Sequence, residues 1–121
     1  MLIGRPSHKE IFNKLKKSRE VVERGQILLI KGISIEADAL ELGYLIAELP
    51  EVLLKLLDEV TPQDYIGARP PAKYYETQIK GTDLFEFKFF SNLFDCDVYL
   101  KFTIKNEIFW LISLHKDKKP K

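Results

Sequence analysis

Three segments near the end of the chain alternate apolar and polar residues, and the polar positions carry groups that can do acid–base chemistry. These segments are residues 84–89, 95–104 and 107–115. Successive side chains of a β-strand point to opposite faces of a sheet, so the polar residues of each segment should share one side. The set that we expect on this face is Glu86, Lys88, Asp97, Tyr99, Lys101, Ser113 and His115.

Such a set contains what cleavage of RNA by its own 2′-hydroxyl requires. A base must remove the 2′ proton, cations must stabilise the charged phosphorane, and an acid must protonate the departing 5′ oxygen. Glu86, Tyr99 and His115 are candidates for the base and the acid, and Lys88 and Lys101 for the cations, with no metal required. The open face of an antiparallel sheet is also normally polar, so the same residues equally suit a solvated surface.

The pairing of the last two strands decides which of these groups meet. A two-residue loop at 105–106 would place Tyr99 and Lys101 beside Ile112 and Trp110. A three-residue loop at 105–107 gives one continuous apolar face, and we therefore predict it. The pairs expected in that register are Ile104–Ile108, Phe102–Trp110, Leu100–Ile112, Tyr99–Ser113 and Asp97–His115.

Length and composition indicate one cytoplasmic domain over residues 1–121. An apolar content of 45% and a charged content of 31% are ordinary for a soluble globular protein. The single cysteine, Cys96, allows no internal disulfide and fits a reducing compartment. There is no run of about 18 apolar residues, and residues 1–6 lack the order of a signal peptide, so we expect no membrane association.

Charge is unevenly distributed along the chain. Residues 5–31 carry eight Lys/Arg against three acids, and residues 32–66 carry one lysine against eight acids. Residues 67–121 carry ten Lys/Arg against seven acids, with four lysines in a tail at 116–121 that we expect to be flexible. Basic surfaces attract phosphates, although solvated helix faces would produce the same pattern.

Capping and periodicity predict helices in the first half of the chain. Ser7 and Glu10 form a capping-box pattern for a helix that runs to Glu23, with Gly25 as its end signal. Residues 26–30 are short and apolar and suit a buried strand. A helix opening at Ser34 would bury one face, and a helix over 51–60 would follow Pro50. The face expected for the first is Ala37, Leu40 and Tyr44, and for the second Val52, Leu53, Leu56, Leu57 and Val60.

Residues 61–71 are rich in proline and glycine and read as a loop, and residues 73–80 alternate weakly as a strand. The order is therefore helix, strand, two helices and a four-strand meander. This order predicts an α+β fold with the N-terminal helices packed on one face of a small antiparallel sheet.

Other kinds of site are poorly supported. His8 and His115 lie at opposite ends of the chain, so no metal-ligand cluster is indicated, and no glycine-rich phosphate loop is present. A triad of Ser113, His115 and Asp97 is disfavoured because no nucleophile elbow surrounds the serine. Three further tyrosines suit base stacking or, more commonly, packing; they are Tyr65, Tyr74 and Tyr75.

Several short motifs resemble one known family. Residues 97–101 (Asp-Val-Tyr-Leu-Lys), a hairpin, and residues 112–117 (Ile-Ser-Leu-His-Lys-Asp) are similar to the end of the MqsR family of mRNA interferase toxins, which has a RelE-like fold. Residues 24–26, 37–43 and 49–51 resemble further segments of that family. The resemblance covers most of residues 6–117 in element order.

Carried across by position, the family's site tyrosine matches Tyr99, whereas its catalytic lysine falls on His115 and its glutamine on Glu86. The family's helix-borne lysine has no clean match, because Lys55 is one position away and Leu56 takes the aligned place. The scaffold therefore transfers better than the site.

The resemblance implies a type II toxin that cleaves mRNA, free or on the ribosome, without metal or small-molecule cofactor, and that is bound by a protein antitoxin. The alternative is a non-catalytic protein- or RNA-binding module of the same fold, which the modest net charge of +1 favours. The expected catalytic residues are His115, Tyr99 and Glu86, and the expected phosphate-binding residues are Lys88, Lys101 and Lys116.

Overall fold

The structure, a computed structural model, describes residues 7–68 and 77–117. Three α-helices and four β-strands occur within these ranges, which confirms the α+β class. The helices are α1 (His8–Glu23), α2 (Gly32–Leu42) and α3 (Leu49–Glu59). The strands are β1 (Ile27–Leu29), β2 (Phe85–Ser91), β3 (Cys96–Lys105) and β4 (Ile108–Lys116).

The strands form one mixed sheet in the order β1-β4-β3-β2. Strands β2, β3 and β4 make an antiparallel meander, whereas β1 pairs with β4 in parallel. The predicted four-strand meander is therefore wrong. Residues 77–79 form a short 3-10 helix instead of the end of a strand, and residues 73–76 lie outside the described ranges. The fourth strand is β1, which is at the sheet edge and leaves Leu28 exposed.

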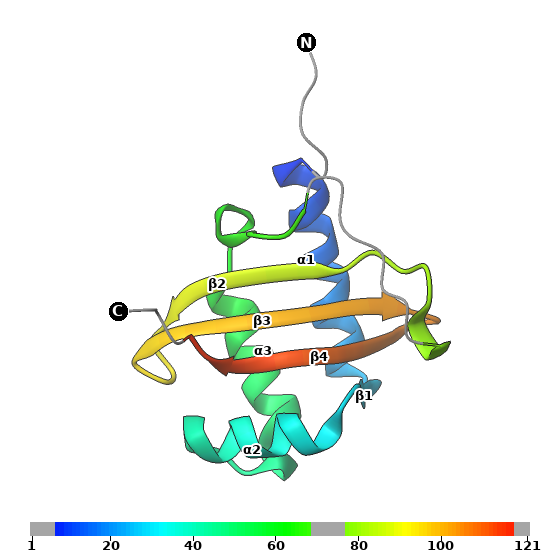
Figure 1. Ribbon diagram of the computed structural model, residues 1–121. Helices are drawn as coiled ribbons and strands as arrows, with labels where there is room; N and C mark the ends of the chain where they lie inside the picture. The colour runs from blue at the N-terminus through cyan, green and yellow to red at the C-terminus, as the bar shows by residue number, and fades with distance from the viewer. Residues whose placement is uncertain (1–6, 69–76, 118–121) are drawn as a thin grey trace.

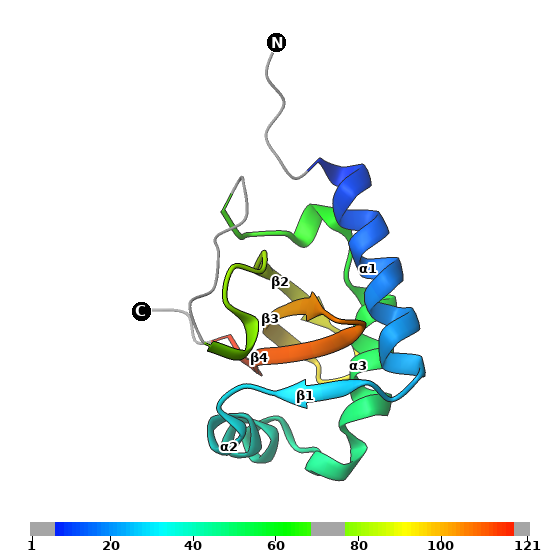
Figure 2. The same ribbon diagram turned by 90° about the vertical axis from the view of Figure 1, so that its right-hand side faces the viewer.

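Helices α1 and α3 cover one face of the sheet, and α2 lies along the edge near β1 and β4 (Figures 1 and 2). The main core fills the space between α1, α3 and the sheet, and its largest members are Phe87, Phe102 and Phe109. We call the opposite side of the sheet the open face. No helix in the described ranges is long and apolar enough to cross a membrane.

The signals predicted for α1 and α3 are confirmed. The Ser7 hydroxyl accepts from the Glu10 amide and the Glu10 carboxylate accepts from the Ser7 amide, which satisfies two free donors of the first turn. Gly25 has φ +75°, a left-handed conformation that ends α1 without strain. Pro50 lies in the first turn of α3, and the whole predicted apolar stripe of that helix is buried.

The face predicted for α2 is wrong. The helix begins at Gly32 and buries Ile35 and Ala39, while Ala37 and Leu40 are exposed. Apolar residues occur on more than one side of this helix, so periodicity alone did not determine which side meets the core. Tyr44 is buried as expected, but it lies beyond the end of the helix.

The β3–β4 hairpin also differs from the predicted register. Its loop has two residues, Asn106 and Glu107, with φ +55° and +59°, and Lys105 pairs with Ile108. Two left-handed residues give a turn whose twist matches that of the flanking strands. The predicted three-residue loop is therefore wrong.

A β-bulge then shifts the register, with Ile112 as the extra residue. Phe102 pairs with Leu111, and the next pair is Lys101 with Ser113. The three-residue prediction assumed one apolar face, but Ile112 and Trp110 belong to a second apolar cluster with Ile30, Ile79 and Leu84. The bulge restores the alternation beyond it, so Ser113 and His115 share the face of Lys101 and Tyr99.

Candidate active site

Polar side chains form two cross-strand rows on the open face. The first row consists of residues that pair directly with one another across β2, β3 and β4, namely Lys88, Tyr99 and His115. The neighbouring row is Glu86, Lys101 and Ser113. All six side chains are partly buried. Directly opposed residues have Cβ atoms about 4.5–5.5 Å apart, so these groups can act on one small ligand.

Tyr99 connects the two rows. Its hydroxyl donates a hydrogen bond to Glu86 Oε1, diagonally across β2 and β3. Its ring stacks on the His115 ring, with centroids 5.0 Å apart and planes 27° from parallel. Burial, followed by the hydrogen bond to Glu86 and the charge of that carboxylate, raises the pKa of Tyr99 well above its ordinary value. Tyr99 is therefore a protonated donor at neutral pH.

The His115 ring is held by a second contact. Its Nδ1 lies 2.9 Å from the backbone carbonyl oxygen of Lys116. A carbonyl only accepts, so Nδ1 must carry a proton, and Nε2 is the nitrogen able to exchange one. Stacking and this hydrogen bond together fix both the plane of the ring and its tautomer.

The three predicted phosphate-binding lysines occupy different environments. Lys88 Nζ lies 3.1 Å from Asp117 Oδ2, a charge pair that lacks the alignment of a hydrogen bond. Lys101 lies between Glu86 and Ser113 in the second row. Lys116 pairs with Val98, whose side chain enters the core, so Lys116 has the opposite parity to His115 and is exposed at the strand end.

The predicted pairs Tyr99–Ser113 and Asp97–His115 do not form. The bulge moves His115 opposite Tyr99, and Asp97 lies opposite Phe90, with its backbone oxygen accepting from the Asp117 amide. Asp97 is thus one row away from His115, and no Ser–His–Asp arrangement results.

Phe90 is a residue of this face that the sequence reasoning missed. It has the parity of Glu86 and Lys88, and 54% of its surface is exposed. A large exposed aromatic ring beside a polar row is not required for packing, and such rings commonly stack on unpaired bases. The available signal was its position two residues after Lys88, which continues the alternation of Glu86 and Lys88 beyond the predicted segment. Of the tyrosines considered for stacking, Tyr65 is buried against Phe87, and Tyr74 and Tyr75 lie outside the described residues.

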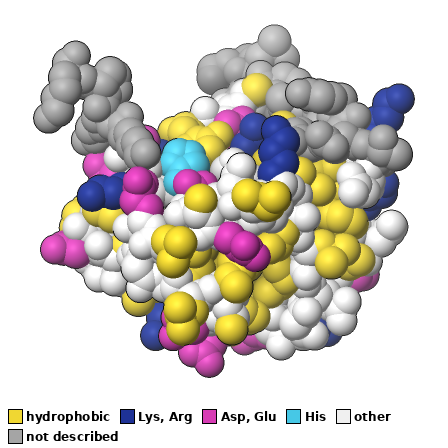
Figure 3. Space-filling view, turned by 60° about the horizontal axis from the view of Figure 1, so that its bottom comes forward, with side chains coloured by type: hydrophobic (Ala, Val, Ile, Leu, Met, Phe, Trp, Pro, Cys, Tyr) yellow, Lys and Arg dark blue, Asp and Glu magenta, His cyan; other side chains and the backbone are white. Residues whose placement is uncertain are grey.

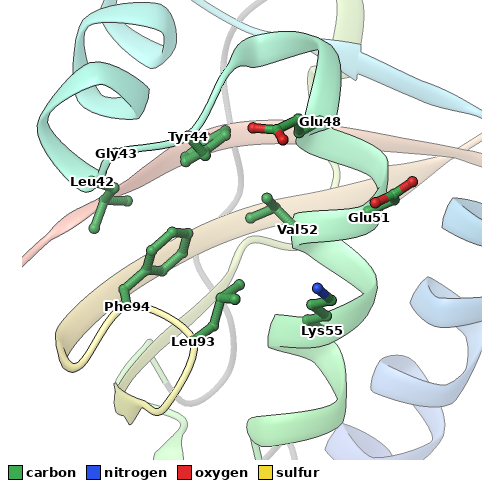
Figure 4. Close-up of a pocket in the computed structure, with 9 residues that line it drawn as sticks. All are labelled: Leu42, Gly43, Tyr44, Glu48, Glu51, Val52, Lys55, Leu93 and Phe94. Carbon is green, nitrogen blue, oxygen red and sulfur yellow. The ribbon is translucent and has the colours of Figure 1, made fainter.

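A hollow of about 330 Å³ lies on the helix side of the sheet, between the end of α2, α3 and the β2–β3 loop (Figure 4). Glu48, Glu51 and Lys55 come to it from the α3 side, whereas Leu56 is buried in the core. Tyr44 also lines it, and burial, together with the charge of Asp38, raises the pKa of Tyr44 to about 12. None of the open-face groups reaches this hollow.

Within residues 7–68 and 77–117, no three His, Cys, Asp or Glu side chains gather as metal ligands would. No known family model matches the chain, and no curated protein is similar enough to count as a relative.

Proposed function

We propose that this protein is an endoribonuclease that cleaves mRNA through the 2′-hydroxyl of its substrate without a metal ion. The observation that carries the proposal is the His115 imidazole, whose plane and tautomer are fixed between Tyr99 and the Lys116 carbonyl. A titratable ring held in this way beside a carboxylate and lysines matches the requirements of acid–base cleavage. Packing alone would not require a histidine there.

In the proposed reaction Glu86 removes the proton from the 2′-hydroxyl, and the resulting oxygen attacks the adjacent phosphorus. The bond to the 5′ oxygen then breaks, and the His115 imidazolium donates its Nε2 proton to that leaving oxygen. The products are a 2′,3′-cyclic phosphate and a free 5′-hydroxyl. Lys101 and Lys88 stabilise the negative charge of the phosphorane.

Tyr99 acts as a positioning residue in this scheme. Its raised pKa keeps the hydroxyl protonated, so it donates to Glu86 instead of accepting a substrate proton. The hydrogen bond occupies one carboxylate oxygen of Glu86, and in this scheme the other oxygen receives the proton of the 2′-hydroxyl. Its ring meanwhile orients His115.

The resemblance of residues 97–101 and 112–117 to MqsR-type sequences extends the proposal to a biological role. That role is the toxin of a type II toxin–antitoxin system in the cytoplasm, acting on mRNA free or at the ribosome and held inactive by a protein antitoxin. The RelE-like identity of the fold belongs to the same proposal.

The test compares cleavage of a long RNA by wild type, His115→Ala and His8→Ala in EDTA, with and without translating ribosomes. His8 is the other histidine and is exposed at the start of α1, away from the open face. We expect wild type and His8→Ala to give the same fragments, and His115→Ala to lose at least 100-fold in rate. Equal rates for the two variants would remove His115 from the mechanism.

One observation favours a second candidate, a binding module without catalysis. Lys88 is already paired with Asp117, which reduces the positive charge available to a phosphate. Such a module would bind RNA or protein on the open face and leave RNA intact under every condition of the assay above.

A further inference from the structure

Helix α2 presents a strip of apolar side chains to solvent. Ile33 is 87% exposed, Leu40 is 77% exposed, and Ala37 between them is also exposed. Seen from the α2 side, apolar side chains spread over a broad part of the surface (Figure 3). Single exposed apolar residues are common, but three on successive turns of one helix form a continuous patch of the kind that marks interaction sites.

Helical geometry gives the strip acidic borders. At about 100° per residue, Ile33, Ala37 and Leu40 fall within an arc of about 60°. Glu36 lies about 40° beyond Leu40 on one side, and Glu41 about 40° beyond Ala37 on the other. Both glutamates are exposed. The buried positions of the helix, Ile35 and Ala39, lie on the far side, so the fold does not use the strip.

We propose that this strip, Ile33–Ala37–Leu40 with Glu36 and Glu41 on its borders, docks an amphipathic helix of a protein partner. The partner helix has an apolar centre that packs on the strip and Lys or Arg on both flanks that pair with the glutamates, as e and g positions pair in coiled coils. The acidic region around α2 supports this choice, because residues 32–66 carry eight acids and only one lysine. The inference does not depend on the ribonuclease activity.

A second copy of the chain is a poorer occupant. Packing α2 on α2 about a two-fold axis would bring the glutamates of both helices together, which is unfavourable. The basic helix α1 offers Phe12 as its one large apolar side chain with high exposure, too little to cover a three-residue strip. Charge and apolar area therefore both favour a different, basic partner.

The probe is a fluorescein-labelled helical peptide with leucines at i, i+4 and i+7 and lysines on both flanks, measured by fluorescence anisotropy. A matched peptide carries glutamates in place of the lysines. We expect wild type to bind the lysine peptide at least tenfold more tightly than the glutamate peptide. Leu40→Ser should weaken that binding at least tenfold, whereas Phe12→Ser, at a similarly exposed position on α1, should leave it unchanged.

Charge reversal separates a docking strip from general attraction to an acidic protein. The double variant Glu36→Lys/Glu41→Lys should prefer the glutamate peptide, because both borders of the strip change sign. Glu51→Lys, on α3, should keep the wild-type preference. An unchanged preference in the double variant, or equal weakening by Phe12→Ser, would overturn the proposal. So would a wild-type dimer in sedimentation that Leu40→Ser dissociates, since a second copy would then occupy the strip.

Discussion

Tyr99 stacks on His115 because the bulge at Ile112 shifts β4 by one residue against β3. Without that extra residue the histidine would lie on the opposite parity, toward the core face. The bulge therefore assembles the proposed site, and it does so at the border between the polar rows and the Trp110–Ile112 cluster. Bulges at such positions commonly re-aim side chains near active sites.

Tyr99→Phe should separate the two contacts of Tyr99. The variant keeps a ring to stack on His115 but loses the hydrogen bond to Glu86. We expect the free energy of unfolding to fall by about 1 kcal/mol, since a partly exposed hydrogen bond to a carboxylate is lost. Cleavage should fall about tenfold, and Tyr99→Leu, which also removes the stack, should lower it further.

Tyr44→Phe is the matched control for that substitution. The Tyr44 hydroxyl is buried and has no hydrogen-bond partner among the described residues. Removing an unpartnered buried hydroxyl should leave stability unchanged or raise it by up to about 1 kcal/mol. Urea unfolding measures both variants, and equal destabilisation by the two would contradict the Tyr99–Glu86 hydrogen bond.

The raised pKa of Tyr99 predicts a loss of stability at alkaline pH. Its hydroxyl stays protonated in the folded protein beyond pH about 10, the ordinary value for an unfolded tyrosine. Its contribution to stability is therefore complete below pH about 10 and is lost as the pH rises toward the folded pKa. The free energy of unfolding, measured from pH 8 to 11, should decline less steeply in Tyr99→Phe than in wild type. Identical slopes would mean that Tyr99 titrates normally.

Phe90→Ala should weaken RNA binding if its ring stacks on a base. Stacking of one base on an aromatic ring contributes about 1–3 kcal/mol, so we expect the Kd of a short RNA to rise about five-fold or more. Phe12→Ala is the control, since Phe12 is 58% exposed but lies on α1. Binding is measured by anisotropy in the His115→Ala background, where we expect cleavage to be at least 100-fold slower. An equal effect of both substitutions would remove Phe90 from the site.

Two substitutions of Glu107, in the β3–β4 turn, should differ in their effect on stability. Its carboxylate pairs with Lys17 at 2.6 Å and Arg24 at 3.0 Å, and the hydrogen bond from Lys17 is the main cause of its lowered pKa. Glu107→Gln should destabilise only slightly, because these pairs are exposed to solvent. Glu107→Gly also loses them but relieves the left-handed backbone, so it should be more stable than Glu107→Gln. Thermal unfolding ranks the two variants, and the reverse order would argue against the two-residue turn.

The sequence predicted the elements that carry their own local signals. The capping residues Ser7 and Glu10, and the apolar stripe of α3, were sufficient to place two helices. Alternation correctly assigned β2 and β3 to their faces, because each strand has one apolar and one polar side. These features depend on neighbouring residues alone.

Features that depend on distant contacts were not predictable in the same way. The pairing of β1 with β4 and the buried face of α2 are set by packing between elements. The register of β3 against β4 was predicted wrongly because Trp110 and Ile112 are apolar residues on the open face, where only polar residues were expected. The candidate residues Glu86, Tyr99 and His115 were identified from parity, but the contact between Tyr99 and His115 depends on the bulge, which the sequence did not indicate.

The ends of the RNA fragments test the central claim most directly. Wild-type protein is incubated in EDTA with an RNA, and with translating ribosomes if free RNA stays intact, and the new ends are identified by mass spectrometry. Attack by the 2′-hydroxyl predicts 2′,3′-cyclic phosphate and 5′-hydroxyl ends, and no cut at a site where the 2′-hydroxyl is replaced by hydrogen. Fragments with 5′-phosphate ends, or intact RNA under both conditions, would contradict the proposed reaction.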